Sequence, residues 1–334
     1  MPTLSVIIPF FQRETGILAR ALSSIDSQQI PPGWSVEVVV VDDGSPYPAQ
    51  EEVRALRLRE PLGLKVVRQE NLGVSAARNR GLDEADPSAN LIAFLDSDDT
   101  WPPLHVANAA EAYERGFDFV FSDNRREPYH ESYLKVHAPR TRAFLKQAKN
   151  EGGLIAVPPS EMQSLVIEEF PAHISTLVYC RSIDADLRFN EDLEACGEDK
   201  LFIVALLSKA KRVCYSSKTV VECGRGVNIF FTNNRWDSPS YLEIQQNQLR
   251  CHTLISELPG LSEYALACSL KAVRNWRNNF AFHTVRRMLT SKGKFPKEAR
   301  LLARTDHGFP VWFPLSLARI VLGYTLGTFR PFPR

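Results

Sequence analysis

The sequence lacks several features that define common classes of protein. Its six cysteines, at positions 180, 196, 214, 223, 251 and 268, include no CxxC pair, which argues against a zinc or thioredoxin-like centre. A chain of 334 residues does not need disulfide bonds for stability, so we predict reduced core cysteines in a cytoplasmic protein. No GxGxxG follows the first apolar segment, and a dehydrogenase would need one.

Signals for export and for membrane insertion are also missing. No run of 18 uncharged apolar residues is present, so no ordinary membrane span is expected. The chain enters an apolar segment at Leu4 without a preceding basic region, so no signal peptide is expected.

The two ends of the chain differ in charge. Residues 241–334 contain 14 Lys and Arg but 5 Asp and Glu, so the first 240 residues are acidic although the net charge is only +1. An acidic N-terminal part suits a metal-dependent site. A basic C-terminal part suits an anionic partner such as a membrane surface or a phosphate-bearing molecule. We expect no nucleic-acid partner.

Short apolar runs alternate with helical patterns in the first 125 residues. Five runs rich in Val, Ile and Phe are predicted strands, at 4–9, 36–41, 64–67, 91–95 and 117–121. Three helices are predicted. Thr15 would cap the first, and the other two cover residues 75–85 and 104–115. The alternation predicts an α/β fold with a Rossmann-like, mostly parallel sheet and helices on both faces.

The rest of the chain is less regular at first. Residues 126–170 are rich in Pro, Lys and Glu, and we interpret them as a loop-rich insertion. Residues 171–223 return to mixed strand and helix, and from Tyr241 onward the pattern is helical.

Carboxylates gather where the predicted strands end. Asp42 and Asp43 follow the second strand, and Asp96, Asp98 and Asp99 follow the fourth. Ligands bind outside the carboxyl ends of parallel strands, so we expect these side chains to share one rim of the sheet. Like charges together are costly unless a cation neutralises them. We therefore predict bound Mn²⁺ or Mg²⁺, which prefer oxygen ligands.

Each motif also has a purely structural interpretation, and at this point both stay open. The acidic residues 96–99 also suit the cap of a following helix. Asp42 either hydrogen-bonds a ligand or belongs to a plain Asp-Gly turn. Arg78 either reaches anions at the rim or lies on a solvated helix face. Glu198 and Asp199 either supply a general base or only cap the apolar helix that follows.

Taken together and in order, the motifs resemble family 2 glycosyltransferases with a GT-A fold. The resemblance covers residues 3–225 and rests on SVIIPFFQRE, VVVVDDGS, NLGVSAARNRGL, FLDSDD and GED. It implies inverting transfer of a sugar from a nucleoside-diphosphate sugar, with uridine diphosphate as carrier. The acceptor would be a hydroxyl of a saccharide or a lipid-linked saccharide, in surface polysaccharide assembly. In this family one base removes the acceptor proton while a metal holds the leaving diphosphate.

The resemblance also implies roles for individual residues. Nucleotide binding falls to Pro9, Phe11, Asp42, Arg78, Asp96 and Ser97; metal ligation to Asp98 and Asp96; support of the site or donor-sugar contact to Asp99 and Asp43; and catalysis to Asp199 as base, with Glu198 near the acceptor. His173 is a further candidate for the acceptor side, although a lone histidine is more often structural.

The resemblance divides the chain into two parts. The catalytic domain would span residues 1–225, with a nucleotide-binding half at 1–125 and an acceptor-binding half at 126–225, and residues 226–334 would form a mainly helical region. Many relatives have Thr-Tyr-Asn after the first Pro, where this chain has Phe10-Phe11-Gln12, which keeps stacking but changes the hydrogen bonds. Arg235-Trp236 is similar to a motif of processive synthases and is interpreted as coincidence.

Two other functions are carried as alternatives. A nucleotidyltransferase shares the layout but usually has a Gly-rich, basic loop after its first strand, where this chain has Phe-Phe-Gln-Arg-Glu. A catalytically degenerate nucleotide-binding module would be favoured if the acidic motif or Asp199 were missing, and both are present.

The segment at 309–329 is apolar and aromatic, with Arg319 as its only charge before the final residues. Pro310 and Pro314 are expected to break its start, which leaves about 15 helical residues, or roughly 22 Å, less than a bilayer core of about 30 Å. One interpretation is peripheral contact with the inner face of the membrane, helped by the preceding basic residues. The alternatives are a helix docked on the protein and a dimer contact.

Overall fold

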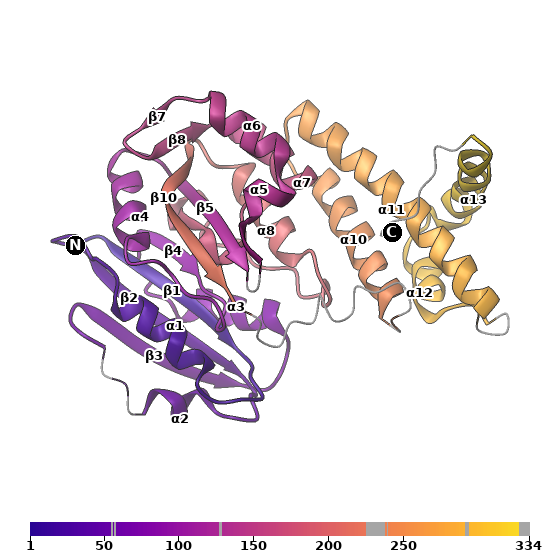
Figure 1. Cartoon of the computed structure of the whole chain (residues 1–334). Coiled ribbons are helices and arrows are strands. Elements are labelled where there is room, and N and C mark those ends of the chain that lie inside the picture. The colour runs from indigo at the N-terminus through magenta and orange to yellow at the C-terminus, as the bar shows by residue number, and fades with distance from the viewer. Residues whose placement is uncertain are drawn as a thin grey trace. The chain divides into compact units, whose positions relative to one another are not determined.

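The computed structural model describes residues 1–54, 56, 58–126, 129–224, 238, 240–290 and 294–326, and Figure 1 shows their helices and strands. The chain forms two compact units. The first comprises Met1–Glu194, the described part of Glu198–Val227, and Pro259–Ala265. The second comprises Ala195–Gly197 and the described parts of Asn228–Leu258 and Leu266–Arg334. Arg235-Trp236 and the predicted boundary after residue 225 lie outside the described residues, so that boundary stays a prediction.

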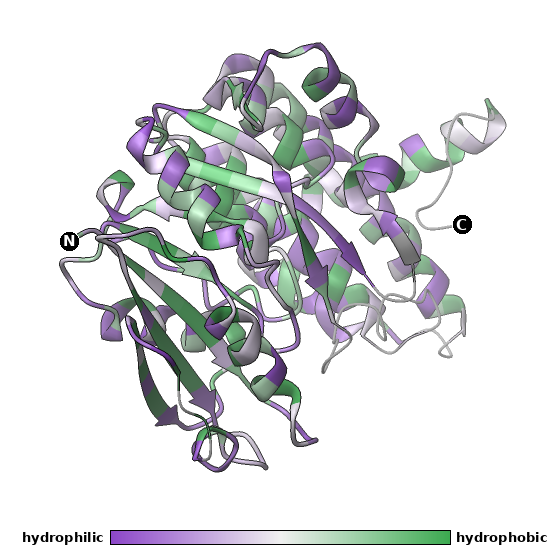
Figure 2. Ribbon diagram, turned by 60° about the vertical axis from the view of Figure 1, so that its left-hand side comes forward, coloured by the Kyte–Doolittle hydropathy of each residue, from purple (hydrophilic) through white to green (hydrophobic). Residues whose placement is uncertain are grey.

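A ten-stranded sheet forms the centre of the first unit. Strand β1 (Thr3–Phe10) pairs in parallel with β2 (Ser35–Asp43) and with β4 (Leu91–Phe94), and β2 pairs in parallel with β3 (Leu62–Gln69). The ribbons of β2 and β3 are mostly green in Figure 2 and end in purple, because apolar strands finish in polar residues. The predicted strands are confirmed.

Alternate residues of these strands face two helical layers. Leu4 and Val6 of β1 belong to one core with residues of α1 (Ile17–Asp26) and α4 (His105–Glu114). On the opposite face, Val39 of β2 contacts Ala77 of α3 (Val74–Glu84). The predicted α/β architecture with helices on both faces is confirmed. Helix α1 has the expected buried side, but its N-cap is Gly16 at φ +89°, not Thr15.

The sheet continues with strands of mixed direction. Strand β9 (Val178–Cys180) runs antiparallel between β4 and β5 (Phe119–Arg126), and β5 pairs in parallel with β10 (Val213–Cys223). Three short elements lie beside strands: α2 (Ala49–Val53) between β2 and β3, η1 (Ile174–Thr176) before β9, and η2 (Arg181–Ile183) after β9. Helix α8 (Glu198–Leu207) precedes β10.

The prediction of a loop-rich insertion at 126–170 is wrong. This stretch contains β6 (Tyr129–Ser132), α5 (Tyr133–His137), α6 (Pro139–Gln147), β7 (Asn150–Glu151), β8 (Leu154–Val157) and α7 (Pro159–Glu168). Strands β7 and β8 extend the sheet beyond β10. The prolines misled the interpretation, because Pro139 and Pro159 begin helices, where the missing N–H costs nothing.

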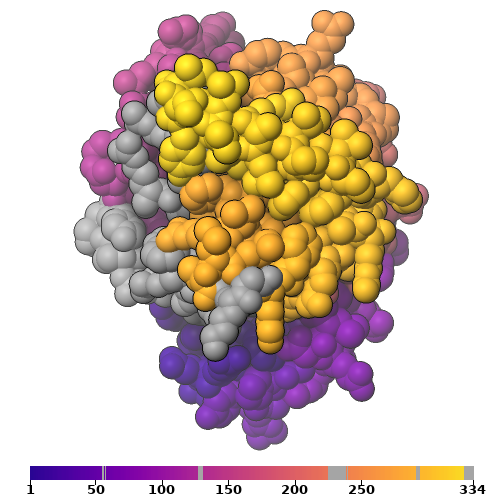
Figure 3. All heavy atoms as spheres, turned by 90° about the vertical axis from the view of Figure 1, so that its right-hand side faces the viewer, coloured from indigo at the N-terminus to yellow at the C-terminus, as the bar shows by residue number. Residues whose placement is uncertain are grey.

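The second unit is helical, as predicted. It contains α10 (Tyr241–Glu257), most of α11 (Glu263–Thr290), α12 (Lys297–Thr305) and α13 (Phe309–Thr325). Figure 3 shows the C-terminal residues, in yellow, as a broad continuous surface. Helix α13 does not start after its prolines. Pro310 lies in its first turn and Pro314 lies inside it, so the expected break there was wrong.

All six cysteines are buried and none is part of a disulfide bond, as predicted. None of the helices in the described parts of the chain has the length and apolar character needed to cross a bilayer.

Close packing of α3 on the sheet generates a first prediction. A Cβ at Gly81 would lie 2.2 Å from Cγ2 of Ile7, a fully buried residue of β1. We expect Gly81→Ala to lower the free energy of unfolding by about 1–3 kcal/mol, because the helix must move away from the strand. Gly63→Ala is the matched control, since a Cβ there meets nothing within 4 Å. Denaturant unfolding of both variants is the measurement, and a Gly81→Ala protein as stable as the control would contradict the packing.

Candidate functional site

The acidic loop at residues 96–99 is fixed between two strands. The amide of Leu95 donates to the carbonyl of Ile7 in β1, at 3.0 Å. Thr100 and Glu222 of β10 exchange two backbone hydrogen bonds, of 2.9 and 3.1 Å. Strands far apart in sequence therefore hold both ends of the loop, which places its carboxylates at the rim of the sheet.

Arg78 of α3 is the buried cation of this rim. Its Nη2 lies 2.9 Å from Oδ1 of Asp96 and its Nη1 lies 3.1 Å from Oε1 of Glu198. Burial opposes the charge of the guanidinium, but these carboxylates outweigh it and raise the pKa of Arg78. Arg78 is only 3% exposed, so the alternative that it lies on a solvated helix face is excluded.

The carboxylates of the rim do not share this cation equally. Burial alone would raise the pKa of Asp96, but Arg78 lowers it below the ordinary value. Burial, and then the charges of Asp99 and Asp96, raise the pKa of Asp98 to about 7. Burial also raises the pKa of Asp99 to about 7, with Asp96 adding to the effect. Of the three loop carboxylates, Asp96 is therefore the one that Arg78 stabilises as an anion, whereas the pKa values of Asp98 and Asp99 are raised.

Helix α8 brings a second acidic pair to the same place. Glu198 and Asp199 form its first turn, and burial followed by the charge of Asp199 raises the pKa of Glu198 to about 7. Asp199 is half-buried, and its Oδ1 accepts a hydrogen bond from the amide of Lys200 at 2.7 Å. Arg78 therefore joins the acidic loop to the start of α8.

An aromatic cluster positions this junction. Phe189 stacks on Phe202 of α8 at 4.0 Å between centroids, and Phe94 of β4 meets both rings edge to face. The guanidinium of Arg78 lies 5.2 Å from the centroid of Phe189. The cluster thus packs under the ion pairs and excludes water from them.

Asp42 and Asp43 lie at the end of β2, and their oxygens are engaged by the protein itself. Asp42 accepts from the amides of Ser45 and Ala49, at 2.8 and 2.9 Å, and pairs with Arg68 at 3.0 Å. Asp43 accepts from Gln69, Leu72 and Gly73, at 2.8, 2.9 and 2.9 Å. Both residues therefore shape the turns beside the site, and a role toward the nucleotide stays a prediction.

The remaining nucleotide-side residues lie at the end of β1. Pro9 is buried within the strand, and Phe11 is half-buried just after it. Gln12 follows, and its side chain donates to Oγ of Ser97 at 3.0 Å, while its amide donates to Oγ of Ser45 at 2.9 Å. Gln12 and Ser45 were not among the predicted site residues. Their position, two residues beyond the end of an apolar strand, was the signal that could have identified them.

His173 lies at the acidic loop rather than apart from it. Its Nδ1 is 3.7 Å from Oδ2 of Asp99 and 3.8 Å from Sγ of Cys223, the last residue of β10. Burial lowers the pKa of His173, which favours the neutral ring. Ser175 holds the same loop, because its Oγ accepts from the amide of Asp96 at 3.0 Å. Cys223 and Ser175 were not predicted as site residues.

The site therefore brings together Asp96, Asp98, Asp99, Arg78, Glu198, Asp199 and His173. Its donor set fits a divalent cation. Burial and the charges of Asp99 and Asp96 raise the pKa of Asp98, so bound positive charge would stabilise its ionised carboxylate oxygens. Such oxygens are the ligands that Mg²⁺ and Mn²⁺ prefer.

Comparison with known sequences gives the family. Residues 5–163 match the family model described as glycosyl transferase family 2. The succinoglycan biosynthesis protein ExoW of Rhizobium meliloti is 33% identical over 253 residues, which cover 74% of this chain and 76% of ExoW.

Solved structures share the fold. The S. aureus TarS fragment 1–349 in complex with UDP-GlcNAc has a TM-score of 0.62 at 21% identity, covering 99% of this chain and 94% of that one. A mannosyltransferase from Pyrobaculum calidifontis, in complex with GDP-Man and Mn²⁺, has a TM-score of 0.59 at 16% identity, covering 98% and 87%. The predicted GT-A-type fold is confirmed by these glycosyltransferase structures, and by its match to ExoW the chain belongs to glycosyl transferase family 2.

Proposed function

We propose that this glycosyltransferase moves a sugar from a nucleoside-diphosphate sugar to an acceptor hydroxyl and inverts the configuration of the anomeric carbon. The proposed carrier is uridine diphosphate, and the proposed acceptor is a saccharide or lipid-linked saccharide in surface polysaccharide assembly. One observation carries the proposal: Arg78 joins the acidic loop after β4 to the acidic first turn of α8. The likeness to ExoW supports the polysaccharide setting, and the UDP-GlcNAc complex of TarS supports the carrier.

The donor would bind along the ends of β1, β2 and β4. In this proposal Pro9 and Phe11 contact the base, Asp42 hydrogen-bonds it, and Asp96 and Ser97 face the ribose and diphosphate. Asp42 and Ser97 are already held in place by hydrogen bonds to Ser45 and Gln12, so little ordering is needed on binding.

Asp98 and Asp96 are the proposed metal ligands, with Asp99 and Asp43 in support. A Mn²⁺ or Mg²⁺ ion supplies positive charge that stabilises the leaving diphosphate. The mannosyltransferase of similar fold was solved with Mn²⁺, which supports this choice of cation. Asp98 is suited to the role because its raised pKa reports an unsatisfied need for positive charge.

Asp199 is the proposed general base. It stands one residue after Glu198, which Arg78 holds at the rim, and its charge acts on both of these side chains, which supports a carboxylate directed toward the acceptor side of the acidic loop. Asp199 would take the acceptor proton while the new glycosidic bond forms and the bond to the diphosphate breaks. A single displacement of this kind needs one carboxylate base and inverts the anomeric centre. Glu198 and His173 would contact the acceptor. No observation favours the nucleotidyltransferase or the degenerate module.

Peripheral contact with the inner face of the membrane is proposed through residues 309–329, of which 327–329 lie outside the described residues. One side of α13 is docked, with Phe309, Trp312 and Ile320 buried, so the docked-helix alternative holds for that side. The other side is apolar and exposed: Val311, Leu315, Val321, Leu322, Tyr324 and Leu326. Exposed Lys297, Arg300 and Arg304 of α12 supply the basic charge that anionic lipid attracts.

The metal proposal predicts the behaviour of Asp98→Asn. Transfer should fall by about 100-fold or more, because the variant loses a charge that binds the cation. Without metal, the variant should melt higher than the wild type above pH 7 but not near pH 4. The folded pKa of Asp98, about 7, exceeds its ordinary value of 3.8, so wild-type stability falls as pH rises through that interval.

The control for this experiment is Asp186→Asn, an exposed position outside the site. It should match the wild type in transfer and in the pH dependence of its melting temperature. Full wild-type transfer in excess EDTA, or normal turnover by Asp98→Asn, would overturn the metal proposal.

The base proposal predicts a separate pattern for Asp199→Asn. The amide keeps the shape and the hydrogen bond to Lys200 but cannot accept a proton, so the transfer rate should fall by about 10²–10⁴-fold. The affinity of the variant for uridine diphosphate with Mn²⁺, measured by calorimetry, should equal that of the wild type. If the Asn variant transfers sugar at a near-normal rate, the base lies elsewhere.

The membrane proposal predicts the effect of charge on the exposed side of α13. The double change Val321→Glu and Leu322→Glu, at side chains 65% and 58% exposed, should weaken binding to phosphatidylglycerol vesicles by about tenfold or more. Val136→Glu on α5 is the control and should bind as the wild type does. Co-sedimentation at two salt concentrations is the measurement, and wild-type protein that stays in the supernatant at low salt refutes the proposal.

A further inference from the structure

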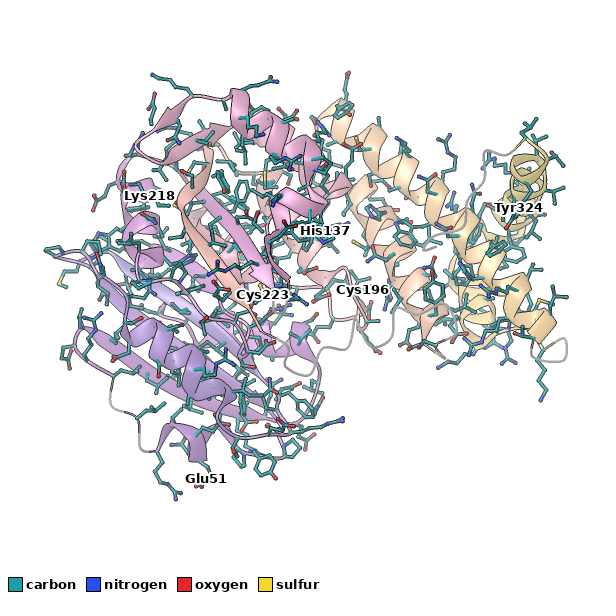
Figure 4. The ribbon with its side chains drawn as sticks, viewed as in Figure 1. Glu51, His137, Cys196, Lys218, Cys223 and Tyr324 are labelled. Atoms are coloured by element: carbon teal, nitrogen blue, oxygen red, sulfur yellow. The ribbon has the colours of Figure 1, made fainter. Side chains whose placement is uncertain are left out.

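Three side chains with different ligand chemistry meet beside the acidic loop. Asp99 follows β4, His173 precedes η1, and Cys223 ends β10, where Figure 4 labels it at the tip of the strand. One ligand atom from each of the three lies within 4.8 Å of the other two. The proposed donor site uses carboxylate oxygens alone, so this cluster of oxygen, nitrogen and sulfur is chemically distinct from it.

The cluster contains an unsatisfied buried atom. Asp99 is 2% exposed, and its Oδ1 accepts a hydrogen bond from the amide of Gly224 at 2.9 Å. Its Oδ2 is buried without a hydrogen-bond partner in the described parts of the chain. A buried carboxylate oxygen without a partner destabilises the folded state, so a retained one points to a ligand that the oxygen binds.

The arrangement does not suit a Cys-His-Asp proton relay. A relay needs both ring nitrogens, one toward the nucleophile and the other toward the carboxylate. Here the contacts with Asp99 and with Cys223 both involve Nδ1 of His173. The amide of Ser175 also donates to this Nδ1, at 3.3 Å, so Nδ1 is unprotonated, and its lone pair becomes available to a cation when that long contact is given up. An unprotonated imidazole nitrogen, a thiol sulfur and a carboxylate oxygen together form a set of metal ligands.

The distances match a tetrahedral ion. Bonds of about 2.3 Å to sulfur and about 2.0–2.1 Å to nitrogen or oxygen place neighbouring ligands about 3.4–3.6 Å apart. The observed separations from Nδ1 are 3.7 Å to Asp99 and 3.8 Å to Cys223. Small movements, with loss of the long contact from Ser175, are enough to close the site.

We propose that Asp99, His173 and Cys223 form a second cation site, separate from the donor-metal site, for a thiophilic divalent ion of the Zn²⁺ class. Imidazole and thiolate ligands favour Zn²⁺ over Mg²⁺. On binding, the thiol proton of Cys223 leaves to solvent and the sulfur coordinates the ion. The ion would cross-link the end of β10 to the acidic loop, which already meet closely, since a Cβ at Gly224 would lie 2.0 Å from the carbonyl oxygen of Asp98.

The test is a titration of the full-length, metal-free protein with Co²⁺, a spectroscopic substitute for Zn²⁺. We expect one equivalent to give a thiolate-to-cobalt charge-transfer band and the visible bands of tetrahedral cobalt. Zn²⁺ should abolish both, and excess Mg²⁺ should not. Cys223→Ala should lose the charge-transfer band and weaken Zn²⁺ binding by about 100-fold or more. Cys214→Ala, at another buried cysteine of β10, is the matched control and should keep both.

Two further measurements keep the proposal falsifiable. Zn²⁺ should raise the melting temperature of the wild type and of Cys214→Ala, and Asp98→Asn should keep its Zn²⁺ affinity. If Cys223→Ala does not fold, the wild-type cobalt spectrum and His173→Ala decide the matter. A wild-type protein without a charge-transfer band, or a band that survives in Cys223→Ala, overturns the site. Loss of Zn²⁺ binding in Asp98→Asn overturns its separateness from the donor metal.

Discussion

The buried guanidinium of Arg78 is the interaction on which the rest of this site depends. A carboxylate at the end of an apolar strand and another at the start of a buried helix repel each other and are poorly solvated. Arg78 pairs with both, Asp96 at 2.9 Å and Glu198 at 3.1 Å. Without a fixed cation at that point, the acidic loop and α8 would separate or bind protons. The ion pairs thus hold together two segments that are 102 positions apart in sequence, counting from Asp96 to Glu198, and so form a single site.

Helix α3 can deliver this cation only because it packs directly on the sheet. Gly81, one turn after Arg78, leaves no side chain between the helix and Ile7. Asp43 fixes the start of the same helix by accepting from the amides of Leu72 and Gly73. A residue predicted to touch the donor therefore also positions the helix that carries the cation. Asp42 instead accepts from the amides of Ser45 and Ala49, so the two carboxylates that end β2 hold different segments.

The sequence alone could predict the layers of the fold but not the contacts within the site. Apolar strands and amphipathic helices follow from periodicity, and these predictions were confirmed. Periodicity does not say whether a proline ends a helix or begins one, so Pro139 and Pro159 were misread. Nor does it show that β10 returns to the acidic loop, which is what brings Cys223 to His173. Gln12 and Ser45 were missed for the same reason: their importance lies in partners distant in sequence.

Arg78 does not stabilise all of the carboxylates that meet here, and this inequality is itself informative. Arg78 lowers the pKa of Asp96, while burial and neighbouring carboxylates raise the pKa of Asp98 to about 7. Burial likewise raises the pKa of Asp99 to about 7, and it does so on the side of the loop that faces His173. The protein therefore favours the ionised form of the carboxylate that Arg78 contacts, and it disfavours the ionised form of Asp98 and Asp99. Ionising these buried neighbouring carboxylates is electrostatically costly, although the strands and helices around the loop are well packed. A cost of this kind is typical of a functional site, where positive charge brought by a ligand would offset it.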